Sequence, residues 1–111
     1  MNQEKEKVYF IYTTVCRTAD APVLAEKLVK SRLVACVNVL PEIQACFAYH
    51  DDVNWSSESI LLIKTLGENL EAAIALLKKV HPYEIPCIAT VSIDHVDQGY
   101  VGWMKEWMLP S

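Results

Sequence analysis

The sequence is poor in glycine: only three glycines occur in 111 residues, and there is no Gly/Ser-rich or low-complexity segment. Few breaks in regular structure are therefore expected after the first few residues. A chain of this length corresponds to one domain, with nothing left over for a second. We interpret residues 1–7 as a charged N-terminal tail and residues 8–109 as a single domain.

Long apolar runs are also missing. No stretch approaches the roughly 20 apolar residues that a membrane span requires, and the N-terminus is charged where a signal peptide would be apolar. The four cysteines are widely spaced, with no C-x-x-C pair. The sequence therefore predicts a cytoplasmic protein with free thiols and no contact with a membrane.

An excess of positive charge is absent as well. Ten Lys and Arg residues against 14 Asp and Glu give a net charge of −4, which argues against a nucleic-acid-binding surface. Intrinsic disorder is excluded because 52% of the residues are hydrophobic. The mean hydropathy of +0.16 is high for a chain this small. Since a small domain has much surface to cover, part of the apolar surface is expected to be shared with a partner subunit.

Catalytic motifs are missing too. The loop Thr14–Thr18 has an arginine but no glycine with which to cradle a phosphate, and no G-x-S-x-G nucleophile motif occurs. The adjacent carboxylates Asp51 and Asp52 are typical of a solvated turn. We expect no enzymatic reaction and assign no catalytic residue.

What is present is a regular series of apolar segments. Residues 8–14 predict a strand, and an amphipathic helix follows from an N-cap at Asp20 to near Arg32. Residues 33–40 predict a strand that Pro41 ends, and residues 43–50 and 59–66 predict a hairpin with a turn at Asp51–Asp52. Then come a helix around residues 70–79, a strand over 88–93, and a C-terminal helix over 100–108 that Asp97 caps.

This order predicts an α+β fold: a ferredoxin-like βαββαβ sandwich with an added C-terminal helix. Both helices of such a sandwich lie on one face of an antiparallel sheet. The other face then needs a partner subunit or the C-terminal helix to cover it, because the strands are apolar on both sides.

One segment stands out chemically, His81-Pro82-Tyr83-Glu84-Ile85-Pro86. Its two prolines predict a rigid connector that holds an imidazole, a phenol and a carboxylate close together. The alternative is a purely structural helix stop with Tyr83 packed and Glu84 solvated. The three histidines and four cysteines show no spacing typical of a metal site.

The same segment, followed by Ile88, resembles the CutA1 family of divalent-cation tolerance proteins. The strings Arg32-Leu33-Val34-Ala35-Cys36-Val37-Asn38-Val39 and Leu62-Ile63-Lys64-Thr65 resemble it too, and the likeness runs from Val8 to Trp107. The resemblance implies a ferredoxin-like subunit in a PII-like homotrimer, a cytoplasmic location, a link to tolerance of copper and other divalent ions, and no established reaction.

The resemblance also implies a cleft between subunits near His81, Tyr83 and Glu84, to which Lys64, Cys36 and Trp103 would belong. We expect copper or another divalent cation to bind weakly, with His81 as ligand and Glu84 and Cys87 as its partners. Lys64, on an apolar strand, would favour an anionic or carboxylate partner, or would extend to solvent at a sheet edge.

Two departures from the family pattern bear on metal binding. Cys87 stands where an acidic residue is usual, and Tyr12 stands where some bacterial members carry a metal-binding cysteine. An alternative function therefore stays open: a PII-like trimer that senses a small ligand or scaffolds a partner, with no metal role.

Overall fold

The computed structural model describes residues 6–110, and residues 1–5 of the expected tail lie outside them. The elements follow in the order β1 (Val8–Val15), α2 (Asp20–Lys30), β2 (Cys36–Tyr49), β3 (Asp52–Leu66), α3 (Gly67–Val80), β4 (Ala89–Ser92) and α4 (Gln98–Trp107). The predicted α+β class and the order of elements are confirmed. None of the helices in residues 6–110 is long and apolar enough to cross a membrane.

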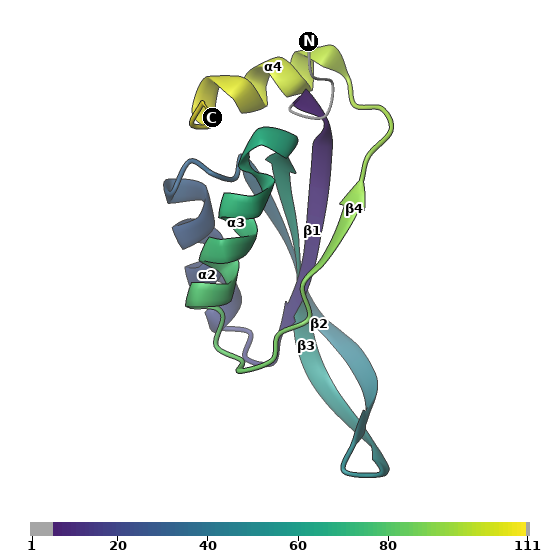
Figure 1. Cartoon of the computed structure of the whole chain (residues 1–111). Helices are drawn as coiled ribbons and strands as arrows, with labels where there is room; N and C mark the ends of the chain where they lie inside the picture. Colours follow the sequence, from purple (N-terminus) through teal and green to yellow (C-terminus); the bar gives the residue numbers. More distant parts are fainter. Residues whose placement is uncertain (1–5, 111) are drawn as a thin grey trace.

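The four strands form one antiparallel sheet in the order β2-β3-β1-β4. Helices α2 and α3 lie on the same side of this sheet, and α4 lies across one end of it (Figure 1). The β2–β3 hairpin extends well beyond the other end, so the molecule is elongated, 49 × 25 × 22 Å.

The main core lies between the sheet and the two helices α2 and α3. Every second side chain is buried along residues 11–15 of β1 and 59–65 of β3, as expected for strands whose residues alternate between two faces. The fully buried members on the sheet side are Ile11, Val15, Leu61 and Ile63, and they pack against Leu24, Leu28, Ala73 and Leu77.

A second, smaller core forms where α4 meets the end of the sheet. Met104 and Met108 of this helical end pack against Val8 and Leu66. The predicted cap is confirmed: the Asp97 carboxylate accepts hydrogen bonds from the backbone N–H groups of Gly99 and Tyr100, at 2.9 and 3.4 Å. Helix α4 is thereby held over one end of the sheet.

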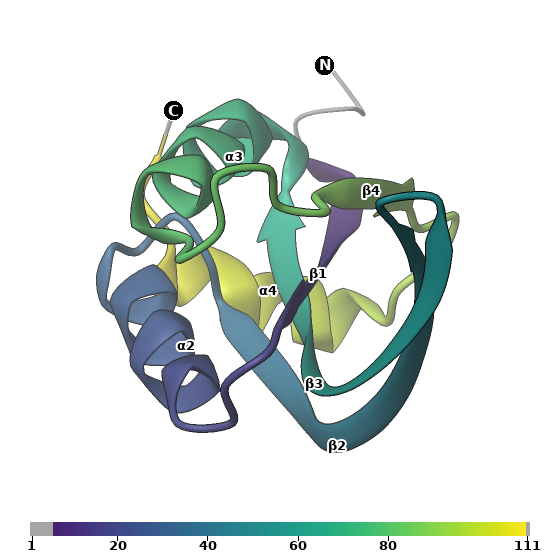
Figure 2. The same cartoon turned by 90° about the horizontal axis from the view of Figure 1, so that it is seen from below.

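Figure 2 shows α2 and α3 together on one side of the sheet, and α4 is the only helix among residues 6–110 that reaches the opposite side. We call this side the open face. Its side chains are mostly apolar and only partly covered, and they come from all four strands: Phe10, Tyr12, Leu40, Ile60, Leu62 and Val91. Val91 is 54% exposed and Leu40 is 40% exposed, so part of the apolar surface expected from the composition lies here.

The prediction that Pro41 ends a strand is wrong. Strand β2 continues through it, with a shift in register between Leu40 and Ile43 and a positive φ of 57° at Glu42. Proline is tolerated because β2 is an edge strand, where a missing N–H need not interrupt the ladder. The local bulge lets the strand bend and continue into the long hairpin.

Two predicted boundaries are also corrected. Asp20 is the first residue of α2, and Ala19 at the cap position makes no side-chain cap. The hairpin turn consists of His50 and Asp51, both with positive φ, because Asp52 already pairs with Tyr49. Two positive φ values match the tight turn that suits the twist of a hairpin.

Candidate functional site

His81 is buried, 7% exposed, at the end of α3. Its Nε2 lies 3.0 Å from the Thr13 hydroxyl and 3.0 Å from the Thr14 carbonyl oxygen, and its Nδ1 accepts a hydrogen bond from the Tyr83 backbone N–H at 3.1 Å. Since Nδ1 accepts, the ring proton lies on Nε2, which donates to Thr14. Both nitrogens of the imidazole are therefore engaged within the chain.

This environment favours the neutral ring. Burial lowers the pKa of His81 below its ordinary value, and the hydrogen bond to the Thr14 carbonyl offsets part of that shift. A neutral imidazole is the form that binds metals. Coordination through Nδ1 would, however, require the hydrogen bond from Tyr83 to break.

The lowered pKa predicts how stability depends on pH. The unfolded chain takes up a proton on this histidine near pH 6.5, and the folded chain does so only at lower pH. Stability from the neutral ring is thus complete above about pH 6.5 and is lost as the pH falls through the folded pKa. In metal-free buffer, urea midpoints between pH 7 and pH 5 should fall more steeply for the natural chain than for His81→Gln. Equal slopes would contradict this assignment.

Tyr83 packs its ring edge-on to His81, with ring centroids 4.8 Å apart. Its hydroxyl is buried and has no hydrogen bond of good geometry among residues 6–110. Burial raises the pKa of Tyr83 above its ordinary value, and the neighbouring thiol of Cys16 adds to the shift. Tyr83 is thus packed, as expected if the segment 81–86 serves as a structural helix stop.

The other two predicted metal ligands lie at the surface. Glu84 and Cys87 are both exposed, and Glu84 borders a hollow of about 340 Å³ together with Lys78 and Ile85. Within residues 6–110, no three His, Cys, Asp or Glu side chains lie close enough to hold a metal ion. All four cysteines are free, as predicted. Residues 6–110 of one chain thus contain no cluster of three such metal-binding side chains.

Lys64 belongs to a different cluster on the open face. It lies on β3 between its cross-strand partners Cys36 and Phe10, and its Nζ lies 5.5 Å from the ring centroids of Phe10 and Tyr100. The ring of Trp103 packs 5.4 Å from that of Tyr100. Because β3 is an interior strand, Lys64 does not lie at a sheet edge.

The structure thus divides the predicted site residues of one chain into two groups. Lys64, Cys36 and Trp103 gather beside α4, whereas Tyr83 and His81 lie near Thr14, toward the opposite end of β1. Four residues of strand, about 13 Å, separate the rows of Phe10 and Thr14. The two groups can line one cleft only if they face each other across different subunits.

Sequence reasoning missed Thr13, Phe10 and Tyr100 as parts of these two groups. Thr13 is a hydroxyl residue at a position of β1 that points to the helix side, and it is fully buried. A polar residue at such a position was a usable indication of a buried hydrogen-bond partner. Nothing in the sequence placed Tyr100 of α4 beside Lys64, because that contact depends on how α4 crosses the sheet.

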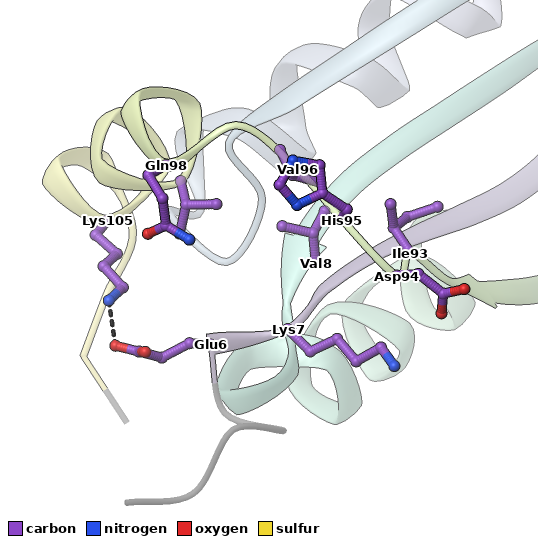
Figure 3. Close-up of a pocket in the computed structure, with 10 residues that line it drawn as sticks. Glu6, Lys7, Val8, Ile93, Asp94, His95, Val96, Gln98 and Lys105 are labelled. Atoms are coloured by element: carbon purple, nitrogen blue, oxygen red, sulfur yellow. Dashed lines mark hydrogen bonds and ion pairs between the residues drawn. The ribbon is translucent and has the colours of Figure 1, made fainter.

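A separate hollow of about 330 Å³ lies between the start of β1 and α4 (Figure 3). It contains the Lys105–Glu6 ion pair and the side chain of His95. None of the predicted site residues lines it, and its charges are of both signs, so it does not favour one class of ligand.

These features define an α+β protein whose four-stranded antiparallel sheet is covered by helices on one face and open on the other. The family model described as "CutA1 divalent ion tolerance protein" matches residues 9–107. The chain therefore belongs to the CutA1 family, as the resemblance of its sequence implied.

Several relatives support this assignment. The divalent-cation tolerance protein CutA of Thermotoga maritima is 30% identical over 89% of this chain and 97% of that protein. A CutA homolog of Xenopus laevis is 30% identical over 86% of this chain, which spans 63% of that longer protein. Among solved structures, CutA1 from Oryza sativa has a TM-score of 0.89 at 28% identity, covering 95% of this chain and 96% of its own. CutA from Xylella fastidiosa has a TM-score of 0.86 at 31% identity, covering 91% and 97%.

Proposed function

We propose that this chain is a divalent-cation tolerance protein that works as a ferredoxin-like homotrimer in the cytoplasm, and that it catalyses no reaction. The proposed role in divalent-cation tolerance rests on the match to the CutA1 family over residues 9–107. Its relatives from Thermotoga maritima and Thermus thermophilus are named for the same role.

The open face supports the assembly. Apolar side chains from four adjacent strands form one continuous surface there, which is typical of a contact between subunits. The hairpin adds to it, since Trp55 is 68% exposed and Val53 is 65% exposed near its tip. A trimer that places each hairpin against a neighbour would remove both apolar regions from water.

Metal binding then depends on donors from more than one subunit, because residues 6–110 of one chain bring together fewer than three His, Cys, Asp or Glu side chains. Glu84 and Cys87 are exposed and have no hydrogen bond to lose among the described residues. His81 would join them only at the cost of its hydrogen bond from Tyr83. That cost supports the prediction that copper or another divalent cation binds weakly.

We expect copper(II) or zinc titration to show saturable binding that Cys87→Ser and Glu84→Gln each weaken by about tenfold, the effect of losing roughly 1.4 kcal/mol of ligation energy. Glu71→Gln, an exposed carboxylate on α3, is the matched control and should bind as the natural chain does. Isothermal calorimetry on the assembled protein measures the metal affinity of the site variants and of the control. Unchanged affinity in the two site variants would refute these ligands, and no saturable binding at all would refute the metal role.

A further inference from the structure

Helix α4 is attached to the rest of the fold more weakly than α2 and α3. Of its ten residues Met104 alone is buried, whereas α2 and α3 each bury three. Residues 93–97, which lead into α4, belong to no helix or strand. An isolated helix of ten residues is marginal in water, so α4 depends on the contacts that it makes with the rest of the chain.

The glycines of α4 weaken it further. Two of the three glycines of the chain, Gly99 and Gly102, lie in this helix, where alanine would be the better helix former. Gly99 has a structural reason, because a Cβ there would lie 2.9 Å from the Asp97 carboxylate that caps the helix. Gly102 is exposed, its φ is not positive, and a Cβ there would meet no described atom outside its own helix within 4 Å. The helix is therefore less stable than its packing requires.

Gly102 lies on the outer side of α4. At the pitch of an α-helix it stands about 160° around the axis from the buried Met104. The side chains that share this outer side are polar or charged and exposed: Gln98, Lys105 and Glu106. Charged residues are depleted in the core of subunit contacts, so we expect Gly102 to face water in the assembly as well.

The contacts that hold α4 gather at its C-terminal end. The Trp107 indole N–H donates to the Val29 carbonyl at 2.9 Å, and the Arg32 guanidinium lies 4.0 Å from the centre of the Trp107 ring. The Leu109 backbone N–H donates to the Arg32 carbonyl, and the Asn69 side-chain amide donates to the Leu109 carbonyl, each at 2.9 Å. We call these contacts the latch. They join α4 to the end of α2 and the start of α3, not to the open face.

We propose that α4 is a strap, which opens at the latch and moves on residues 93–97 while the sheet, α2 and α3 stay folded. Opening uncovers Val8 and Leu66, which the closed strap covers with two methionines. This is the end of the sheet beside which Lys64 lies, so the strap controls access to that end even when subunits cover the open face. The inference depends neither on metal binding nor on the number of subunits.

Hydrogen exchange of the natural chain, followed by mass spectrometry of its peptides, tests the strap. We expect the amides of residues 102–108 to exchange at least about tenfold faster than the paired amides of β1 and β3, because a local opening costs less than global unfolding. Gly102→Ala should slow exchange in 102–108 about fivefold, the difference in helix propensity between the two residues. Trp107→Phe should speed it about fivefold, because the latch loses the indole hydrogen bond.

Ala72→Gly is the matched control, since it makes the reverse substitution at an exposed position of α3. It weakens the main fold and should leave exchange in residues 102–108 unchanged, because the strap opens without α3. If Ala72→Gly speeds that exchange, α4 opens only when the whole chain unfolds and the proposal is overturned. Protection of 102–108 equal to that of β1 in the natural chain would overturn it too. So would a Gly102→Ala chain whose mass by light scattering falls, since the outer side of α4 would then be a subunit contact.

Discussion

Replacing His81 by alanine is expected to lower the free energy of unfolding by about 3 kcal/mol. The substitution leaves the Thr14 carbonyl and the Tyr83 backbone N–H without their partner in a region that water reaches poorly, and it also creates a cavity beside Thr13. Domains of this kind are stable by only about 5–15 kcal/mol, so the loss is a large fraction of the total. Urea unfolding at one fixed protein concentration measures it, because the stability of an assembly depends on concentration.

The matched control is His95→Ala. His95 is exposed and makes no hydrogen bond within residues 6–110, so its removal should change stability by less than about 0.5 kcal/mol. If both alanine variants unfold at the same urea concentration, His81 does not hold the end of α3 against β1. The same pair of variants distinguishes a structural role of His81 from a role in metal binding. A structural role predicts that His81→Ala is destabilised even in metal-free buffer.

Replacing Leu62 by glutamate is expected to dissociate the assembly. Leu62 lies on β3 in the middle of the open face, between Tyr12 and Asn38 of the flanking strands. In a single chain this side chain is half-buried, so a carboxylate there can still reach water. In an assembly that covers the open face, each subunit would bury an unpaired charge, at a cost of several kcal/mol.

Val23→Glu provides the control for that substitution. Val23 is 54% exposed on α2, on the opposite side of the sheet, and introducing a glutamate there should leave the mass of the assembly unaltered. The Leu62→Glu chain should appear as a smaller species or aggregate, because its apolar face is uncovered. A Leu62→Glu protein with the mass of the natural assembly would show that the open face is not the contact.

The sequence predicted the element order because β1 is rich in β-branched and aromatic residues and the apolar positions recur at helical spacing in α2 and α3. It failed at Pro41, where the rule that proline ends a strand ignores whether the strand lies at an edge. Edge position is a property of the whole sheet, so a local pattern does not contain it. The hairpin turn was misplaced by one residue because His50 and Asp51 both adopt positive φ, which is uncommon for any residue other than glycine.

The candidate site was less predictable than the fold. The connector after α3 was identified from its two prolines, but the hydrogen bonds that bury His81 come from Thr13 and Thr14, nearly seventy residues away in sequence. Likewise, Lys64 was chosen as a charge on an apolar strand, and its actual neighbour Tyr100 comes from α4. Contacts between distant segments depend on how helices cross a sheet, and one sequence without its fold does not specify them.

The central claim is that the open face is covered by identical subunits in a trimer. Light scattering on the purified chain at micromolar concentration tests it most directly. The account predicts a mass three times that of the 12.6 kDa chain, unchanged on dilution. A well-folded, soluble monomer of 12.6 kDa would contradict it.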